Sequence, residues 1–190
     1  IQVLNNSVLV PNLINNKPSE YKSVVYVGRI SEEKGILDLL RAWGKNNDFE
    51  LHIIGNGPLL NELKNKNKNK KIHFLGFQNK NKITEKLSKS RALIFPTKLY
   101  EGQGMVPSEA SIIGIPVVSP KLGGMTQLFP EKNSFMYDPD DFDDFIEKIN
   151  LLNNDQLVDN QGKENRKYTL QTFAEETNNK KIIKFFSELN

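Results

Sequence analysis

The chain has 190 residues, 37% of them hydrophobic and 26% charged, which is ordinary for one soluble globular domain with a sizeable core. Its formal net charge of +3 is too small to indicate a nucleic-acid partner. The absence of cysteine excludes disulfides, thiolate chemistry and cysteine-rich zinc sites. No apolar run reaches the roughly 20 residues that a membrane-spanning helix needs. The chain opens on Ile1 in a strand-like segment, and we expect it to be a fragment of a longer protein.

Short apolar runs alternate with helical patterns along most of the chain. The runs are rich in β-branched residues, end at glycine or proline, and predict strands over residues 7–10, 23–27, 49–54, 71–75, 91–95, 115–118 and 134–137. Apolar residues at helical spacing predict helices between them, and Asp138 followed by Pro139 predicts an N-cap and a first helical residue. This β-α-β alternation predicts an α/β fold, a Rossmann-like parallel sheet with helices on both faces.

The last part of the chain is helical in pattern from about residue 155. We expect residues 1–190 to form a single domain, with a Rossmann-like core over about 8–175 and a C-terminal helix over about 176–190. Phe185 and Phe186 have the spacing of packed helical residues. The low-complexity segment 64–71, KNKNKNKK, predicts a solvated helix end or loop, with attraction to anionic lipid as the alternative.

The first strand-to-helix turn combines a glycine with two long cationic side chains. Gly28 lets the backbone turn sharply, and Arg29 and Lys34 have the reach to converge on one anion, for which a diphosphate is the natural match. The alternative is a surface loop whose cations pair with neighbouring glutamates. The turn lacks G-x-G-x-x-G, which argues against a dinucleotide-binding oxidoreductase. Gly55 and Gly57 form another turn that follows a predicted strand. These glycines either serve only to form the turn or let the backbone come close to a base or ribose.

A later loop places two carboxylates around glycines, at the carboxyl end of a predicted strand and the amino end of a helix expected to begin at Gly104 or Met105. Ligands and anions are favoured at such places. On one continuous helix Glu101 and Glu109 would be about 12 Å apart along the axis, but with Glu101 in the loop both can face one pocket. Glu101 has the character of a hydroxyl acceptor, whereas Glu109 could simply interact with the helix dipole. The loop suits a ligand with phosphate and hydroxyl groups, such as a sugar nucleotide.

Two further features bear on metals and on backbone donors. The loop around Gly123 and Gly124 is another strand-to-helix turn that can offer backbone N–H groups. His52 and His73 lie in strand runs, where a packed or edge imidazole is the plainer interpretation. Because the sequence has no His/Asp cluster with metal-ligand spacing, we predict a metal-independent site.

Together these residues resemble the C-terminal, nucleotide-sugar-binding half of glycosyltransferase family 4, retaining enzymes of the GT-B fold. The family pattern E-G-x-G-[ML]-x-x-x-E-A-x-x-x-G-x-P-V is matched from Glu101 to Val117. Other matches, in family order over about residues 8–128, are Val10-Pro11-Asn12, Gly28-Arg29, Lys34-Gly35, Gly55-x-Gly57-Pro58, Phe74-Leu-Gly76 and Gly123-Gly124. The C-terminal third carries little motif information.

The resemblance implies a role for each matched residue. Arg29 and Lys34 would hold the donor diphosphate and stabilise the departing nucleotide, Glu101 would contact hydroxyls of the donor sugar, and Glu109 would accept hydrogen bonds from the ribose. Arg29, Lys34 and Glu101 are the catalytic candidates, and Glu109 is a donor-binding candidate. The other donor-binding candidates are Gly28, Gly55, Gly57, Phe77, Gly102, Gln103, Gly104, Met105 and Val106, with Gly55, Gly57 and Phe77 near the base. No metal or cofactor is expected, and the donor would be a UDP- or GDP-sugar.

Two departures and one missing part qualify the resemblance. Gln103 stands where the family commonly has a bulky residue, and Gln127 where it often has glutamate. A GT-B enzyme also needs an N-terminal, acceptor-binding half, which this chain lacks. We therefore expect the chain to bind donor but to transfer sugar poorly or not at all by itself.

The partners expected from the resemblance are that missing half, a nucleotide sugar and a glycan or lipid-linked acceptor in polysaccharide biosynthesis. We expect a cytoplasmic location, with peripheral contact of the full-length enzyme at the inner face of the membrane as an open possibility. Two other functions stay open. A sugar-nucleotide epimerase half would want an acid/base set that the sequence does not show, and a non-catalytic nucleotide-binding or interaction module would be favoured by loss of Glu101 or Arg29, both of which are present.

Overall fold

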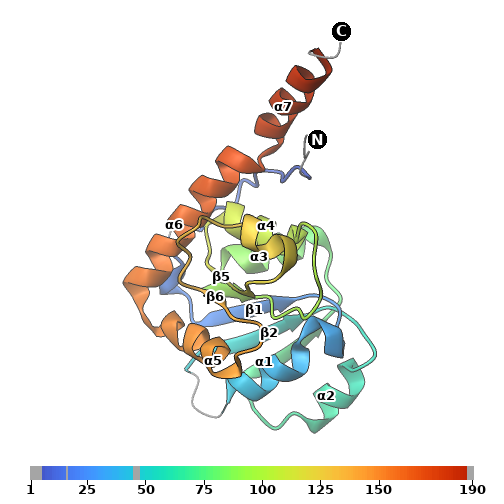
Figure 1. Ribbon diagram of the computed structural model, residues 1–190. Helices are drawn as coiled ribbons and strands as arrows, with labels where there is room; N and C mark the ends of the chain where they lie inside the picture. Colours follow the sequence, from blue (N-terminus) through green and yellow to red (C-terminus); the bar gives the residue numbers. More distant parts are fainter. Residues whose placement is uncertain (1–5, 16, 45–47, 188–190) are drawn as a thin grey trace.

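The computed structural model describes residues 6–15, 17–44 and 48–187, and these build one twisted parallel sheet with helices on both faces (Figure 1). Its six strands are β1 (Ser23–Val27), β2 (Glu50–Ile54), β3 (Ile72–Gly76), β4 (Ala92–Ile94), β5 (Val117–Pro120) and β6 (Met136–Tyr137). The spatial order is β3-β2-β1-β4-β5-β6, and every pair is parallel. The Rossmann-like α/β architecture predicted from the sequence is confirmed.

Each face of the sheet buries its own hydrophobic cluster because both faces are covered. In β1, Val24 and Tyr26 point to one cluster while Val25 and Val27 point to the other. The first cluster is covered by α1 (Ile36–Trp43), α2 (Leu60–Lys66) and α5 (Phe142–Asn150), and the second by α3 (Lys80–Ser88) and α4 (Met105–Ile113) (Figure 1). The apolar strand runs of the sequence are explained by this two-sided burial.

Two long helices close the chain. Helix α6 (Asp155–Thr172) packs along α4, and α7 (Glu175–Ser187) follows it after a short break. Helix α7 extends away from the sheet, beside the N-terminal segment (Figure 1). Phe186 is 58% exposed, so the prediction that it packs is wrong. Within the described ranges, none of the helices is both long and apolar enough to span a membrane.

Some predicted boundaries need correction. Residues 7–10 are not a strand of the sheet, since Val8 makes only an isolated bridge to Ala174. The N-cap of α5 is Asp141, not Asp138, because the Asp141 carboxylate accepts the N–H of Asp144 while Asp138 and Pro139 lie in the preceding loop. The described residues also form four short 3-10 turns: η1 (Pro18–Glu20), η2 (Glu32–Lys34), η3 (Gly123–Gln127) and η4 (Leu151–Asn153).

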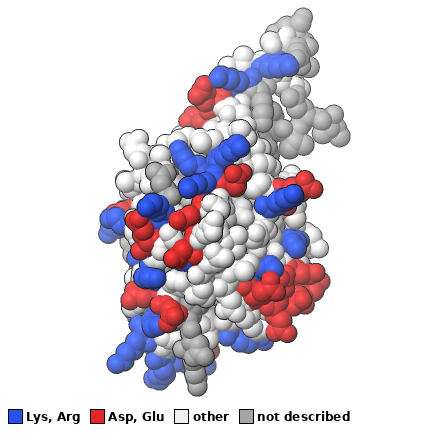
Figure 2. Space-filling model, turned by 90° about the vertical axis from the view of Figure 1, so that its left-hand side faces the viewer, with Lys and Arg blue, Asp and Glu red and all other residues white. Residues whose placement is uncertain are grey.

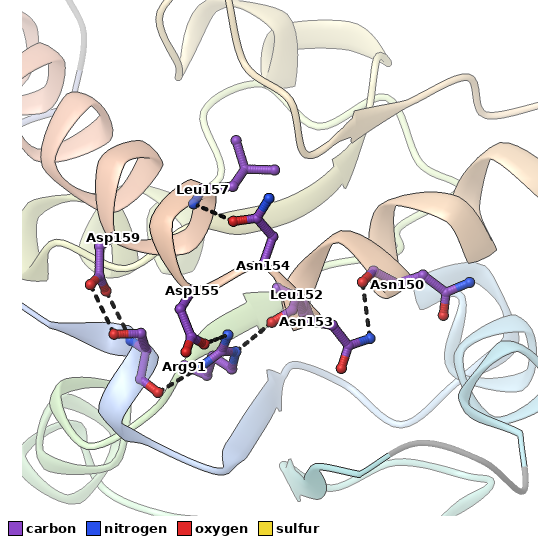
Figure 3. A network of polar contacts seen from close by, with 9 residues as sticks. Arg91, Asn150, Leu152, Asn153, Asn154, Asp155, Leu157 and Asp159 are labelled. Atoms are coloured by element: carbon purple, nitrogen blue, oxygen red, sulfur yellow. Dashed lines mark hydrogen bonds and ion pairs between the residues drawn. The ribbon is translucent and has the colours of Figure 1, made fainter.

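A buried arginine ties the C-terminal helices to the sheet. Arg91, just before β4, donates to the carbonyls of Leu152 at 2.5 Å and Ser19 at 2.7 Å, and to the carboxylate of Asp155 (Figure 3). The Arg91 residue is fully buried, and its guanidinium also stacks over the Phe49 ring. Because a buried guanidinium is stable only when its donors are satisfied, this residue fixes where α6 begins relative to β4.

The face shown in Figure 2 carries charged side chains of both signs, with a group of acidic side chains at its lower right and basic side chains in its upper part and along the bottom. This mixture agrees with the small net charge of +3. A broad basic surface of the kind that binds nucleic acid is not seen on that face.

Candidate functional site at the carboxyl ends of β1 and β4

The strand order changes direction between β1 and β4, and a cleft of about 240 Å³ lies outside their carboxyl ends. Crevices at such topological switch points are where open α/β sheets bind ligands. The loop after β1 and the loop after β4 supply its walls. Predicted site residues that line the cleft are Gly28, Arg29, Lys34, Glu101, Gln103, Gly104, Met105 and Val106. The structure therefore brings both predicted loops together.

The loop after β1 is held by backbone contacts that require glycine. Gly35 has φ +71°, and a Cβ there would lie 1.8 Å from the carbonyl oxygen of Pro96. This close approach joins the end of η2 to the loop after β4, which brings Lys34 next to Glu101. The buried hydroxyl of Tyr26 donates to the carbonyl of Arg29 at 2.6 Å, and burial raises the pKa of Tyr26, so it stays a donor. The Arg29 side chain itself is exposed at the cleft mouth.

A cation and a carboxylate meet inside the cleft. Lys34 Nζ lies 2.5 Å from Glu101 Oε1, and the hydroxyl of Thr97 donates to the same oxygen at 3.1 Å. Both charged side chains are about one-fifth exposed, at 23% and 22%, so solvent and ligand can still reach them. The pair holds a positive and a negative group side by side, where a ligand with phosphate and hydroxyl groups could engage each.

The amino end of α4 opens toward this pair. Its N-cap is Gly104, which has no side chain to cap the helix, and Met105 and Val106 begin it. The first N–H groups of a helix lack intrahelical partners, and the helix dipole makes that end attractive to anions. The expectation that the helix starts at Gly104 or Met105 is confirmed.

Gln103 is engaged by the N-terminal segment rather than left free. Its side-chain amide accepts the N–H of Asn6 at 2.7 Å and donates to the carbonyl of Asn6 at 2.9 Å. A contact between Gln103 and a sugar would therefore have to replace or rearrange this two-way bridge. Nothing in the local sequence signalled it, because the two residues are 97 positions apart.

Glu109 does not share the cleft of Glu101. It lines a neighbouring hollow of about 470 Å³ between α3, α4 and the segment 9–13, where its carboxylate pairs with Lys80 Nζ at 3.2 Å. The prediction that both glutamates face one pocket is not met in this geometry, since Glu101 points from the loop and Glu109 from the second turn of α4. The hollow around Glu109 is partly apolar, with Leu9, Ile112 and Ile113 among its walls.

The other predicted glycines have packing roles. A Cβ on Gly55 would lie 1.9 Å from the Gly28 carbonyl, and one on Gly57 would lie 2.3 Å from that of Ile30, so this turn presses against the loop after β1. Gly102 accepts close contact from another glycine, since a Cβ on Gly124 would lie 1.6 Å from the Gly102 carbonyl oxygen.

Phe77 is 78% exposed, and neither it nor Gly55, Gly57 or Gly102 lines the 240 Å³ cleft. Sequence reasoning missed Tyr26 and Thr97, which do line it. The only feature of the sequence that could have indicated these two residues is that each lies near the carboxyl end of a predicted strand.

Residues 13–168 match the model of the family described as Glycosyl transferases group 1. Because this match spans most of the chain, the chain belongs to that family of glycosyltransferases.

Curated relatives extend well beyond the chain. It is 28% identical over 195 residues to an uncharacterized glycosyltransferase of Methanocaldococcus jannaschii, covering 98% of the chain and 55% of that protein. It is 27% identical over 188 residues to the poly(ribitol-phosphate) alpha-N-acetylglucosaminyltransferase of Staphylococcus aureus, covering 92% and 38%. A sulfoquinovosyl transferase of Arabidopsis thaliana is 27% identical over 147 residues, covering 75% and 29%. The chain thus spans 29% to 55% of the length of these three relatives.

Solved structures share the fold at low identity. Sucrose-phosphate synthase of Thermosynechococcus elongatus superposes with a TM-score of 0.83 at 20% identity, over 99% of this chain and 52% of that one. HepE of Anabaena, solved in complex with UDP and glucose, gives 0.81 at 20% identity over 98% and 57%. The chain therefore has the Rossmann-like fold found in GT-B glycosyltransferase structures.

Proposed function

We propose that the chain is the donor-binding half of a retaining, metal-independent glycosyltransferase of family 4 that uses a nucleoside-diphosphate sugar. The observation that carries the proposal is the convergence of Arg29, Lys34, Glu101 and the amino end of α4 on one cleft at the switch point. Family membership supports it. The shared fold with HepE, a protein that was solved with UDP and glucose bound, is consistent with it.

In the proposed reaction the diphosphate lies between the Arg29 and Lys34 side chains and the first N–H groups of α4. Glycosyl transfer passes through an oxocarbenium-like state while negative charge grows on the leaving diphosphate. Two fixed cations and a helix amino end stabilise that charge, which is the work a divalent metal performs elsewhere. The Arg29 and Lys34 side chains and the amino end of α4 already line the cleft before ligand arrives.

The Lys34–Glu101 pair gives binding a definite first step. An incoming phosphate attracts Lys34 away from Glu101, and the freed carboxylate can then accept hydrogen bonds from sugar hydroxyls. Thr97 keeps Glu101 oriented during this exchange through its hydroxyl. In the same proposal Glu109 accepts the ribose hydroxyls from the adjoining hollow, after release from Lys80, and the base lies toward Gly55, Gly57 and Phe77.

The rest of the enzyme would come from an N-terminal half. The chain spans only part of its relatives, so we propose that it binds donor alone and transfers sugar only with that half present. The acceptor would be a glycan or a lipid-linked sugar in polysaccharide biosynthesis. We propose a cytoplasmic location, with any contact to the inner membrane face made by the full-length enzyme.

Calorimetric titration with UDP, GDP, ADP and CMP, each with and without magnesium, tests the proposal. We expect saturable binding of one diphosphate that magnesium does not alter, because protein cations already neutralise the phosphates. Binding that appears only with magnesium would contradict the metal-independent site. Absence of binding by all four nucleotides would contradict the donor-site assignment.

A further inference from the structure

The sheet brings two histidines and a glutamate together far from the proposed donor cleft. His52 in β2 is paired in register with His73 in β3, and Glu50 lies two residues before His52 on the same face of β2. Glu50 is the first residue of its strand, whereas the donor cleft lies beyond the opposite, carboxyl ends. The cluster was not foreseen in the sequence, because strand pairing, not sequence spacing, unites residues 50 and 73.

The two distances from Glu50 to the histidines match those between neighbouring ligands of one metal ion. Glu50 Oε2 lies 3.4 Å from His52 Nε2 and 3.6 Å from His73 Nε2. One candidate ligand atom from each residue lies within 4.8 Å of the other two. Zinc–nitrogen and zinc–oxygen bonds of about 2.0–2.2 Å at tetrahedral angles place neighbouring ligand atoms roughly 3.3–3.6 Å apart, so these contacts need little adjustment.

The imidazoles also carry unused ligand capacity. Nε2 of His73 and Nδ1 of His52 are buried and have no hydrogen-bond partner in the described part of the chain. His52 is 9% exposed. Buried polar atoms without partners are uncommon, and an ion bound at His73 Nε2 would give that atom its partner.

We propose that Glu50, His52 and His73 bind one imidazole-preferring divalent transition-metal ion, with Zn²⁺ as the best match. Two nitrogens and one carboxylate oxygen are ligands that zinc favours, and they leave a fourth position for water. Glu50 and His73 are 54% and 39% exposed at the side chain, so an ion has a path from solvent. The ion would clamp β3, a terminal strand of the sheet, to β2.

One neighbouring charge opposes the ion. Lys86 on α3 is near enough for its positive charge to act on Glu50 and His52, and that charge would repel a metal cation. Replacing Lys86 with methionine keeps most of the apolar stem and removes the charge. Lys86→Met is therefore expected to tighten metal binding, and weaker binding in this variant would contradict the geometry.

The test is calorimetric titration of ZnCl₂ into chelator-treated protein that carries no polyhistidine tag. We expect one ion per chain and a rise in the thermal unfolding midpoint, because an ion that binds only the folded state stabilises it. Glu50→Gln and His73→Gln should each weaken binding on the order of tenfold or more. Asp48→Asn removes an exposed carboxylate two residues from Glu50 and should leave the affinity within about twofold.

Circular dichroism of each variant checks that the fold is intact. Side-chain imidazole NMR signals give a second readout, since the chain has two histidines and both should shift with zinc but not with magnesium. Absence of saturable zinc binding would overturn the proposal. Binding that is unchanged in both Glu50→Gln and His73→Gln would overturn it as well.

Discussion

At the scale of single residues, the cleft depends on a few charges held by backbone contacts. Lys34 and Glu101 neutralise one another in the cleft, and Arg29 stands exposed at its mouth. The sequence pointed to these three residues because they match the family pattern at two strand-to-helix turns. It did not foresee the Lys34–Glu101 contact, which depends on how tightly Gly35 meets Pro96.

The charges give the first prediction. Arg29→Ala with Lys34→Ala should weaken nucleoside diphosphate binding by several kcal/mol at most, since each charged hydrogen bond contributes roughly 1.5–3 kcal/mol. Lys98→Ala is the matched control, because Lys98 lies on the loop after β4 but pairs with Asp38 outside the cleft. Calorimetry compares the three proteins. Unchanged affinity in the double variant would refute the diphosphate assignment.

A glycine gives the second prediction. Gly35→Ala should lower the free energy of unfolding by at least about 2 kcal/mol, because alanine disfavours φ +71° and its Cβ would strike the Pro96 carbonyl. Gly102→Ala is the control, since a Cβ there meets nothing within 4 Å. Urea unfolding measures both variants. Equal stability of the two would show that the loops do not approach as closely as described.

At the scale of elements, the local sequence predicts buried strands well, but it does not predict helix caps or contacts that depend on strand pairing. The strand 23–27 was found to the residue because both of its faces are apolar and buried. The strand 49–54 was found nearly to the residue because Phe49, Leu51 and Ile53 bury one of its faces. The start of α5 was misplaced because Asp138, Pro139 and Asp141 all suit a helix start, and only the bond from Asp144 N–H to Asp141 identifies the N-cap. The histidine cluster was invisible because it depends on the β2–β3 register.

The N-cap gives the third prediction. Asp141→Ala should lower the free energy of unfolding by about 1 kcal/mol, because the N–H of Asp144 loses its acceptor. Asp141→Asn keeps an acceptor oxygen and should cost much less. Thermal or urea unfolding compares them. An equal loss in the two variants would mean that charge, not the hydrogen bond, is what Asp141 provides.

At the scale of the whole molecule, Arg91 joins η1, η4 and α6 to the sheet (Figure 3). Arg91→Leu should lower the free energy of unfolding by roughly 3 kcal/mol, because the buried carbonyl of Leu152 and the partly buried carbonyl of Ser19 lose their donor. Asp155→Asn should cost far less, since the Asp155 side chain is 70% exposed. If the two variants lose equal stability, the ion pair rather than the carbonyl bonds holds the helices.

The same contact sets a pH dependence. The hydrogen bond and positive charge of Arg91 lower the pKa of Asp155 below its usual value of about 3.9. Its contribution to stability is therefore fully present above that usual value and is lost as the pH falls through the lower pKa of the folded state. Asp155→Asn should make the free energy of unfolding fall less steeply as the pH is lowered, as measured by urea unfolding between about pH 5 and 2. The same pH dependence of stability in both proteins would show that protonation of Asp155 does not affect folding.

The central claim is that a nucleoside diphosphate binds at the switch point between β1 and β4. Titration of the isotopically labelled chain with the preferred diphosphate, followed by backbone amide NMR, tests it most directly. The amides of 28–35 and 102–106 should shift together with one saturation curve, because the two loops form one site. Saturable shifts confined to other parts of the chain, or no shifts in either loop, would contradict the account.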